Sequence, residues 1–394
     1  MDFKRLKGAR LKGKTALVRV DFNVPRHKDG SISDDTRLRA AAPTIEYLRG
    51  KGARVVLLSH FGRPKGKVDA ALSLRFIMPR LGEVLGTEVY FNDQINPAVI
   101  DALPQDAVLL LENTRFDAGE AVGDDELAKR YAELGDVFVQ DAFSVSHRAH
   151  VSSSGIAAHL PAYAGLNMER ELDHLSQALD VPKKPVMAVV GGAKVSTKID
   201  LLNNLVKKLD VLAIGGGMAN TFLAALGHGV GKSLHEAALK DTALEIMESA
   251  KKAGCTIMLP IDGVAATEFK AGAKHRVVGL DDVKPAEMIL DAGPETVNGL
   301  VDAMDKAKTL IWNGPLGAFE IEPFDTSTVE AAKYAVKRVK KHGLIAVAGG
   351  GDTVAALNHA GAAEDFTFIS TAGGAFLEWM EGKTLPGVEI LTQK

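Results

Sequence analysis

The chain has little of several features that would place it in a specialised class of protein. It contains a single cysteine, Cys255, among 394 residues, so no disulfide can form within it. One cysteine suits a reducing compartment, and we expect a cytoplasmic protein. The basic N-terminal stretch lacks the apolar core of a signal peptide, and no apolar run approaches membrane-spanning length.

Charge of one sign is not in excess, and aromatic residues are few. Lysines and arginines number 47 against 50 aspartates and glutamates, which gives a formal net charge of −3. Aromatic residues make up 6% of the chain, and those near the basic segments described below are Phe22 and Phe61. A nucleic-acid-binding protein would have a basic surface with aromatic side chains for stacking. We therefore expect no nucleic-acid partner and no membrane partner.

Two common nucleotide-binding motifs are also missing. Gly231-Lys232-Ser233 looks like the end of a GxxxxGK[ST] loop, but Leu226 stands where the first glycine belongs. No GxGxxG occurs at the strand-to-helix turns predicted here, which argues against a dinucleotide-dependent dehydrogenase. That class stays open as an alternative, because glycine after a strand is common to dehydrogenases as well.

What is present is a regular alternation of apolar runs with segments of helical periodicity. Such alternation predicts mainly parallel sheets with helices on both faces. The predicted strands are 15–20, 55–59, 107–111, 137–140, 186–190, 211–214, 256–259, 309–312, 344–348 and 366–370. Helical spacing recurs most clearly at 38–50, 74–86, 127–135, 169–179 and 328–341.

The length of the chain predicts two domains rather than one. We expect an α/β fold with two doubly wound, Rossmann-like parallel-sheet domains joined by a helix, bilobal with a cleft. The N-terminal domain is expected over 1–168, with 372–394 folding back on it. Residues 169–183 are expected to form the linker helix and 184–371 the C-terminal domain.

The predicted strand ends of the first half carry basic side chains. Ligands of an open parallel sheet bind beyond the carboxyl ends of its strands, so these residues should converge. They are Arg37, Arg63, Arg115 and Arg148. A cluster of guanidinium groups suits a small, multiply charged anion, such as a phosphate with a carboxylate. The same segments contain polar residues that can add hydrogen bonds, namely Asp21, Asn23 and His60.

The second half has glycines at the corresponding places. Its strand ends read Gly191-Gly192-Ala193-Lys194, Gly215-Gly216-Gly217, Asn313-Gly314-Pro315, Gly349-Gly350-Gly351-Asp352-Thr353 and Gly373-Gly374. Glycine lets the backbone approach a flat base or a phosphate and exposes its amide donors. Asp352 at a helix start could hold a magnesium ion that bridges phosphates, although an aspartate there is more commonly a helix cap.

Lys194 and Lys198 follow the predicted strand 186–190. The order of strand, glycine turn and helix start predicts an anion site. Their four-residue spacing predicts that both side chains project on one side of the first helical turn. Two solvated lysines at a helix start are the alternative interpretation.

Together, these segments resemble the phosphoglycerate kinase family. The matching segments are RVDFNVP (19–25), HFGRP (60–64), ENTRF (112–116), GGAKVSTK (191–198), GGGMANTF (215–222), WNGPLGAFE (312–320) and GGGDT (349–353). They follow the order of the family and span nearly the whole chain. The resemblance implies a monomeric phosphotransferase with a carboxyl acceptor. It would transfer phosphate between 1,3-bisphosphoglycerate and MgADP in glycolysis and gluconeogenesis, giving 3-phosphoglycerate and ATP, by in-line transfer with domain closure.

The resemblance also implies a role for each site residue. The phosphoglycerate would be held by Asp21, Asn23, Arg37, His60, Arg63, Arg115 and Arg148. The nucleotide would be held by Gly192, Lys198, Gly216, Gly217, Asn313, Pro315, Glu320, Gly349, Gly350, Gly351, Asp352 and Thr353, with Glu320 on the ribose and Asp352 acting through Mg²⁺. The groups around the transferring phosphoryl group would be Arg37, Lys194, Gly350 and Gly373.

The chain departs from the pattern of the family at two positions. Ala372 stands where a third glycine is common, and Ser144 stands where glycine is frequent. If position 372 requires a positive φ, alanine would strain the loop. A non-catalytic protein that binds a phosphate ligand is a further alternative to the enzyme.

Overall fold

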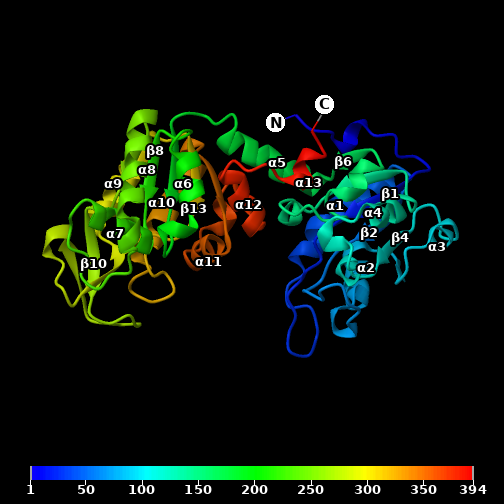
Figure 1. The fold of residues 1–394 in the computed structure, drawn as a ribbon, viewed down its shortest axis with the longest axis horizontal. Helices are drawn as coiled ribbons and strands as arrows, with labels where there is room; N and C mark the ends of the chain where they lie inside the picture. Colours follow the sequence, from blue (N-terminus) through cyan, green and yellow to red (C-terminus); the bar gives the residue numbers. More distant parts are fainter. Residues whose placement is uncertain (1, 393–394) are drawn as a thin grey trace. The chain divides into compact units, whose positions relative to one another are not determined.

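The computed structural model describes residues 2–392, which divide into two compact units. The first unit contains the residues up to Asp173 and the tail from Thr384, and the second is His174–Lys383. The division falls within helix α5 (Leu166–Leu179). In each unit, helices cover a β-sheet, as Figure 1 shows. None of the helices within residues 2–392 has the length and apolar character needed to cross a membrane.

The sheet of the first unit has six parallel strands in the order β3-β4-β2-β1-β5-β6. Its strands are β1 (Thr15–Arg19), β2 (Arg54–Leu58), β3 (Val89–Asn92), β4 (Val108–Leu111), β5 (Val137–Gln140) and β6 (Ala162–Ala164). The strands β1, β4 and β5 are buried along their whole length. That burial is expected of parallel strands with helices on both faces, and it explains their nearly continuous apolar sequences.

The helices of the first unit are α1 (Thr36–Gly50), α2 (Met78–Leu85), α3 (Pro97–Asp101), α4 (Asp125–Ala132) and α13 (Pro386–Glu389). Buried apolar residues of α1 and α2 pack with the strands in one hydrophobic core. In α1, the buried residues Leu38, Ile45 and Leu48 recur at helical spacing. The start of α1 is stabilised by Asp34, whose carboxylate accepts a hydrogen bond from the Thr36 amide at 2.8 Å.

The C-terminal tail is divided between the two units. Helix α12 (Gly373–Met380) belongs to the second unit, where Asn204 Nδ2 donates to the Met380 carbonyl at 2.6 Å. The last residues join the first unit, where the Lys4 amide donates to the Leu391 carbonyl at 2.8 Å. Our sequence-based boundary assigned all of 372–394 to the first domain. The boundary lies after Lys383 and not at 372, because α12 packs against α6 and β14 of the second unit.

The main sheet of the second unit also has six parallel strands, in the order β15-β14-β13-β7-β8-β9. They are β7 (Val186–Val190), β8 (Val211–Ile214), β9 (Thr256–Met258), β13 (Thr309–Asn313), β14 (Ile345–Gly349) and β15 (Phe368–Ser370). Its helices are α6 (Ile199–Leu205), α7 (Gly216–Ala225), α8 (Lys240–Ala253), α9 (Pro294–Lys306), α10 (Thr326–His342), α11 (Gly351–His359) and α12.

A second, smaller sheet in this unit was not predicted. It is antiparallel, in the order β11-β10-β12, and is formed by β10 (Asp262–Ala266), β11 (His275–Gly279) and β12 (Met288–Ala292). These strands mix glycine, aspartate and alanine with few β-branched residues, so their sequences have little strand character of their own. Pairing with their neighbours determines their conformation.

The α/β class with two Rossmann-like parallel sheets is confirmed. Three predicted strands, Val137–Gln140, Val186–Val190 and Val211–Ile214, have the predicted bounds. The strands β3 and β6 were missed. Both are short, and β3 is only partly buried at the edge of its sheet, which leaves a weak apolar signal.

Candidate active site

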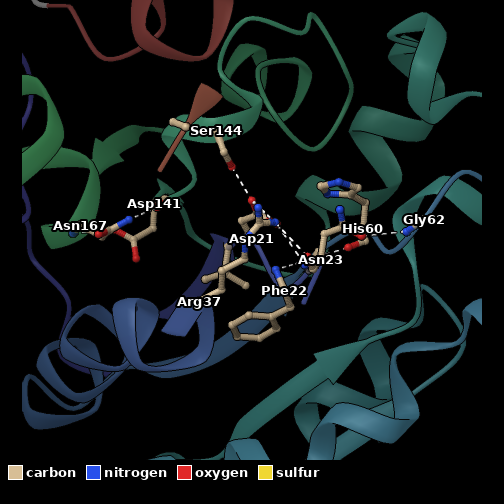
Figure 2. Close-up of polar contacts among 12 residues, drawn as sticks. Asp21, Phe22, Asn23, Arg37, His60, Gly62, Asp141, Ser144 and Asn167 are labelled. Carbon is tan, nitrogen blue, oxygen red and sulfur yellow. Dashed lines mark hydrogen bonds and ion pairs between the residues drawn. The ribbon is translucent and has the colours of Figure 1, made fainter. Parts of the chain in front are cut away.

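The carboxyl ends of β1 and β2 and the start of α1 form the centre of a polar site on the first unit. Arg37, in the first turn of α1, donates from Nη1 to both oxygens of Asp21, at 2.9 and 2.8 Å. The same nitrogen lies 2.9 Å from the backbone oxygen of Asn23. Figure 2 shows this group. Asp21 therefore holds Arg37 in one orientation.

Asp21 is itself held by the two segments beside it. Its carboxylate accepts hydrogen bonds from the Asn23 amide at 3.0 Å and from Ser144 Oγ at 2.5 Å. Ser144 lies in the short helix η6 (Phe143–Val145), after β5 (Figure 2). Burial alone would raise the pKa of Asp21, but the charge of Arg37 and the hydrogen bonds from Ser144 and the Asn23 amide outweigh it and lower that pKa below its usual value. Asp21 is thus an ionised carboxylate at neutral pH.

Hydrogen bonds connect this centre to the ends of β2 and β4. The Gly62 amide donates to Asn23 Oδ1 at 3.0 Å, as Figure 2 shows. The Gly62 carbonyl accepts from Arg115 Nη1 at 2.8 Å, and Arg115 lies in the short helix η4 (Thr114–Phe116) after β4. The loops after three strands are therefore tied together, as the rule for open parallel sheets predicts.

The remaining predicted arginines add positive charge near Arg115. Arg63 and Arg148 are exposed. The pKa of Arg115 is lowered by its burial and by the charges of Arg148 and Arg63, while Glu120 acts in the opposite direction. Like charges close enough to affect one another in this way favour the binding of an anion between them.

His60 is buried near these arginines, and its imidazole stays neutral. Its side chain is buried, and burial together with the charge of Arg19 lowers its pKa well below the usual value. Arg19 Nη2 lies 3.0 Å from His60 Nδ1. Arg19 was not among the residues predicted for this site. The sequence feature that could have identified Arg19 is its position as a charged residue at the end of an otherwise apolar strand.

The second unit has a pocket of about 530 Å³ at the carboxyl ends of its main sheet. Six of the predicted nucleotide residues line it, namely Gly192, Gly216, Gly217, Pro315, Glu320 and Asp352. Its volume falls in the range of small-molecule sites, which is about 300–1,000 Å³.

Glycine is required where the ends of β7 and β13 meet beside this pocket. A Cβ on Gly191 would lie 1.8 Å from the Pro315 carbonyl oxygen. Gly314 has φ +105°, and a Cβ there would lie 2.2 Å from the Gly191 carbonyl oxygen. Side chains at these positions would push the two backbones apart, so the glycines allow the close approach that shapes the pocket wall.

Lys198 and Asn313 form a polar group next to the pocket rather than in its lining. Lys198 Nζ donates to Asn313 Oδ1, and Asn313 Nδ2 donates to the Gly349 carbonyl at 2.7 Å. Thr353 Oγ1 accepts from the Gly314 amide at 2.7 Å. Burial lowers the pKa of Lys198 to about 8, while the charge of Asp352 opposes that shift. Lys198 is therefore a cation that titrates close to neutral pH.

Lys194 and Lys198 do not share a helical face, which corrects our prediction. A single turn of 3-10 helix, η8 (Val195–Thr197), separates them. Lys194 is extended, with φ −136° and ψ 134°, and its side chain is exposed. Lys198 has φ −134°, and its side chain turns inward to Asn313. Four-residue spacing places side chains together only in an α-helix, and this turn is not one.

Two helices begin at the ends of β14 and β15. Helix α11 starts at Gly351 after Gly350, whose φ is +99°, and α12 starts at Gly373 after Ala372. Ala372 has φ −93°, so alanine is not strained there. Both helices present free backbone amides at their first turn, as an anion site requires.

Several pocket residues were missed by the sequence analysis. They include Asn220, Lys232, Leu234, Phe269, Met288, Ile289 and Leu290. Lys232 belongs to the triplet that we set aside because it does not complete a GxxxxGK[ST] loop. Met288, Ile289 and Leu290 come from β12, which was not predicted, so no signal linked them to the site.

The comparisons with known proteins agree with this geometry. The chain matches the phosphoglycerate kinase family over residues 6–383. It is 60% identical to a phosphoglycerate kinase of Caulobacter vibrioides (strain NA1000 / CB15N) over 99% of this chain and 100% of the relative. It is 56% identical to one of Rhizobium meliloti (strain 1021) over the whole of both chains.

Solved structures lead to the same conclusion. The phosphoglycerate kinase of Coxiella burnetii has a TM-score of 0.93 and 42% identity, and that of Pyrococcus horikoshii OT3 has 0.75 and 30%. Each comparison covers 98% of both chains. The resemblance seen in the sequence is confirmed, and the chain belongs to the phosphoglycerate kinase family.

Proposed function

We propose that the first unit holds phosphoglycerate, that the second holds ADP or ATP, and that the phosphoryl group passes directly between them. The reaction is that of the family, in which 1,3-bisphosphoglycerate and ADP are converted reversibly to 3-phosphoglycerate and ATP in glycolysis. The observation that supports this division is chemical. Arginines converge on the first unit, whereas glycine amides, apolar side chains and a pocket of nucleotide size occur together on the second.

In the first unit, Arg63, Arg115 and Arg148 supply charge for the phosphate of phosphoglycerate. The Asp21 carboxylate holds Nη1 of Arg37, so the other N–H donors of the guanidinium group point in a fixed direction. The neutral imidazole of His60 adds a hydrogen bond to the substrate. Guanidinium groups pair with phosphate and carboxylate oxygens in a bidentate manner, so orientation matters as much as charge.

In the second unit, the pocket offers different surfaces to different parts of a nucleotide. Gly192, Gly216 and Gly217 allow the backbone to approach closely. Leu316 and Ile289 provide an apolar wall suited to a base, and the Glu320 carboxylate suits ribose hydroxyls. Lys198 and the backbone amides from the end of β14 into the first turn of α11 (Gly349, Gly350, Gly351 and Thr353, beside Asn313) suit the phosphates.

We propose that Mg²⁺ binds with the nucleotide and that Asp352 is its protein ligand. Asp352 is exposed in the first turn of α11 and lines the pocket. Within residues 2–392, no group of three metal-ligating side chains lies together. This donor set fits Mg²⁺, which commonly takes one or two carboxylates, waters and substrate phosphates. When bound, the ion would neutralise charge on the phosphates.

The chemistry requires positioning and charge stabilisation rather than a general base. In the direction that consumes ATP, the attacking carboxylate of 3-phosphoglycerate is already ionised at neutral pH. The developing charge on the transferring group calls for cations and amide donors in place before the reaction. We assign these roles to Arg37, Lys194 and the amides of Gly350 and Gly373.

Formation of ATP from 1,3-bisphosphoglycerate and ADP, followed with a coupling enzyme, tests the proposed activity. We expect sustained turnover that depends on Mg²⁺. Binding of both ligands without ATP formation would favour the non-catalytic alternative. A change in nicotinamide absorbance without any coupling enzyme would favour the dehydrogenase, which membership of this family already argues against.

Transfer between substrates held by separate units requires the two substrates to be adjacent when the phosphoryl group passes, and we propose that the units close around them. We therefore expect the radius of gyration to decrease when 3-phosphoglycerate and MgATP are both present, and to change less with either one alone. Small-angle X-ray scattering measures this. Equal radii of gyration in all four conditions would contradict closure. Closure would also expel water that could hydrolyse the acyl phosphate.

The pKa of Lys198 predicts a pH dependence of nucleotide use. Because burial lowers this pKa to about 8, the lysine is charged below about pH 8 and loses its charge above it. The ratio kcat/KM for ADP reports groups of the free enzyme, so it should fall as the pH rises through about 8. A Lys198→Met variant should have a lower ratio and lack this decline. A decline of the same size in both proteins would assign it to another group.

Ser144 is expected to strengthen phosphoglycerate binding through Asp21. A hydrogen bond to a charged group contributes about 1.5 kcal/mol, so Ser144→Ala should raise the KM for phosphoglycerate by about tenfold. The KM for the nucleotide should stay unchanged. Ser154→Ala, which removes another half-buried hydroxyl of the first unit, serves as the control. An unchanged KM for phosphoglycerate would mean that Arg37 and Asn23 position Asp21 without help.

We also propose that the enzyme is a cytoplasmic monomer. Residues of a single chain form both candidate sites, so neither needs a second copy. Analytical ultracentrifugation at the concentrations used for the assay tests the monomer, and activity that rises with enzyme concentration faster than linearly would contradict it.

A further inference from the structure

We infer that Arg19 fixes the tautomer of His60, so that the ring presents an N–H donor at Nε2 to phosphoglycerate. This inference rests on the binding role proposed for His60. It assigns a function to Arg19 as a positioning residue, because its side chain is fully buried and acts through the imidazole.

The geometry at Nδ1 leaves one arrangement of protons. Arg19 ends β1, and its Nη2 lies 3.0 Å from Nδ1 of His60, which follows β2. A guanidinium group stays protonated in proteins and has donors only. Nδ1 must therefore accept, and a neutral imidazole with an accepting Nδ1 carries its proton on Nε2.

A buried chain of hydrogen bonds holds the Arg19 guanidinium in this orientation. Arg19 Nε donates to Ser152 Oγ at 2.9 Å, and Ser152 Oγ donates to Glu120 Oε1 at 2.5 Å. The Ser152 amide donates to the other carboxylate oxygen of Glu120 at 3.0 Å. Arg19, Ser152 and Glu120 are all completely buried, so the positive charge of Arg19 has a compensating negative charge close by.

The charges around His60 keep the ring neutral, which leaves its tautomer to Arg19. Burial disfavours the imidazolium form, and Arg19, Arg115 and Arg37 act in the same direction. Asp21 acts in the opposite direction, but the pKa of His60 is still well below its usual value. Protonation of the ring is therefore not available as a way to attract the substrate.

The tautomer decides the sign of the interaction with an anion. With the proton on Nε2, the ring donates to a carboxylate or phosphate oxygen. With the proton on Nδ1, a lone pair would face the same oxygen and repel it. Because Arg19 occupies Nδ1, it selects the attractive arrangement before any substrate binds.

Nuclear magnetic resonance of ¹⁵N-histidine-labelled enzyme tests the inference directly. The signals of His60 are assigned by their loss in His60→Gln. In the unmodified enzyme, two-bond ¹H–¹⁵N correlations should show the neutral Nε2–H form from about pH 5.5 to about pH 8, a range in which an ordinary histidine titrates. An Nδ1–H form, or titration with an ordinary pKa, would overturn the inference.

Two variants change the contact with the ring, one by removing Arg19 and the other by removing the serine that orients it. Arg19→Gln replaces the donor-only fork with an amide that can donate or accept. Ser152→Ala leaves Arg19 in place without its Nε partner, so it remains informative if Arg19→Gln does not fold. In Arg19→Gln, or in Ser152→Ala if only that folds, Nδ1–H or imidazolium signals should appear and the KM for phosphoglycerate should rise by about tenfold. Pure Nε2–H in that variant would overturn the inference.

The pH profile gives a readout that a purely structural role would not affect. Without Arg19, the pKa of His60 should rise, and the imidazolium form should attract the anion at low pH. The ratio of the KM of Arg19→Gln to that of the unmodified enzyme should therefore fall as the pH decreases through about 6.5. Taking the ratio cancels the titration of the substrate phosphate. A ratio that stays constant with pH would overturn the inference.

Controls separate this inference from the proposed function. Arg54→Met removes an arginine from the neighbouring strand at the opposite end of the sheet and should change neither readout. If His60→Gln leaves the KM for phosphoglycerate unchanged, the binding role of His60 is wrong, whereas the tautomer result stands. If the tautomer is Nδ1–H but His60→Gln raises that KM, the binding role stands and the inference fails.

Discussion

Replacement of Lys194 by alanine should lower kcat by about 100- to 1,000-fold, the usual effect of removing one preorganised charge-stabilising group. Lys194 is exposed at the end of β7, and its backbone is held in place by Thr197, whose Oγ1 donates to the Lys194 carbonyl at 2.9 Å. A cation there is free to meet the charge that develops on the transferring phosphoryl group. The affinity for ADP, measured by calorimetry, should stay nearly unchanged, because the role proposed for this lysine applies to the transition state.

The matched control is Lys207→Ala, which removes an exposed lysine just beyond α6, and it should leave kcat unchanged. Lys194→Arg keeps the charge but changes its shape and should recover only part of the activity. A large loss of ADP affinity at unchanged kcat would contradict this prediction and make Lys194 a nucleotide-binding residue.

Replacement of Asp352 by asparagine should raise the Mg²⁺ concentration that gives half the maximal rate by about 10- to 100-fold. The carboxylate of Asp352 is exposed in the pocket, where asparagine keeps the size of the side chain and removes its charge. Calorimetry of ADP binding at several Mg²⁺ concentrations gives a second readout. The benefit of Mg²⁺ for ADP affinity should shrink in the variant.

Loss of a negative charge also affects nearby lysines, so a control is needed. Glu364→Gln removes an exposed carboxylate of the same unit, in the turn Ala363–Asp365, and should leave the Mg²⁺ dependence unchanged. Since Asp352 raises the pKa of Lys198, Asp352→Asn should also shift the alkaline decline of kcat/KM to lower pH. An unchanged Mg²⁺ dependence would mean that the ion is held by the phosphates without Asp352.

Much of the fold could be predicted because its strands have a strong local signal. Buried parallel strands need continuous apolar sequences, and β5, β7 and β8 were predicted with their observed bounds for that reason. Strands that depend on their neighbours carry no such signal. The small sheet that supplies Met288 and Ile289 to the pocket is of this kind.

The candidate site could be predicted in part because strand order and site position are linked. Residues that follow parallel strands meet at one edge whatever the details of the fold, so Asp21, His60 and Arg115 could be grouped from the sequence. Their partners could not be predicted. The bond from Ser144 to Asp21 spans 123 positions of the chain, and the bond from Arg19 to Ser152 spans 133.

The fold class, the family and the strand-end residues could be recognised from the amino-acid sequence, because apolar periodicity and short motifs are local properties of the chain. The exposure, the protonation and the orientation of individual side chains depend on the tertiary structure. Lys194 and Lys198 look equivalent in the sequence, yet one is exposed and the other is half-buried against Asn313 with a lowered pKa. Burial and the nearest charges control the protonation and the orientation of each side chain. The residues that bury it and the residues that carry those charges come from segments far apart in the chain.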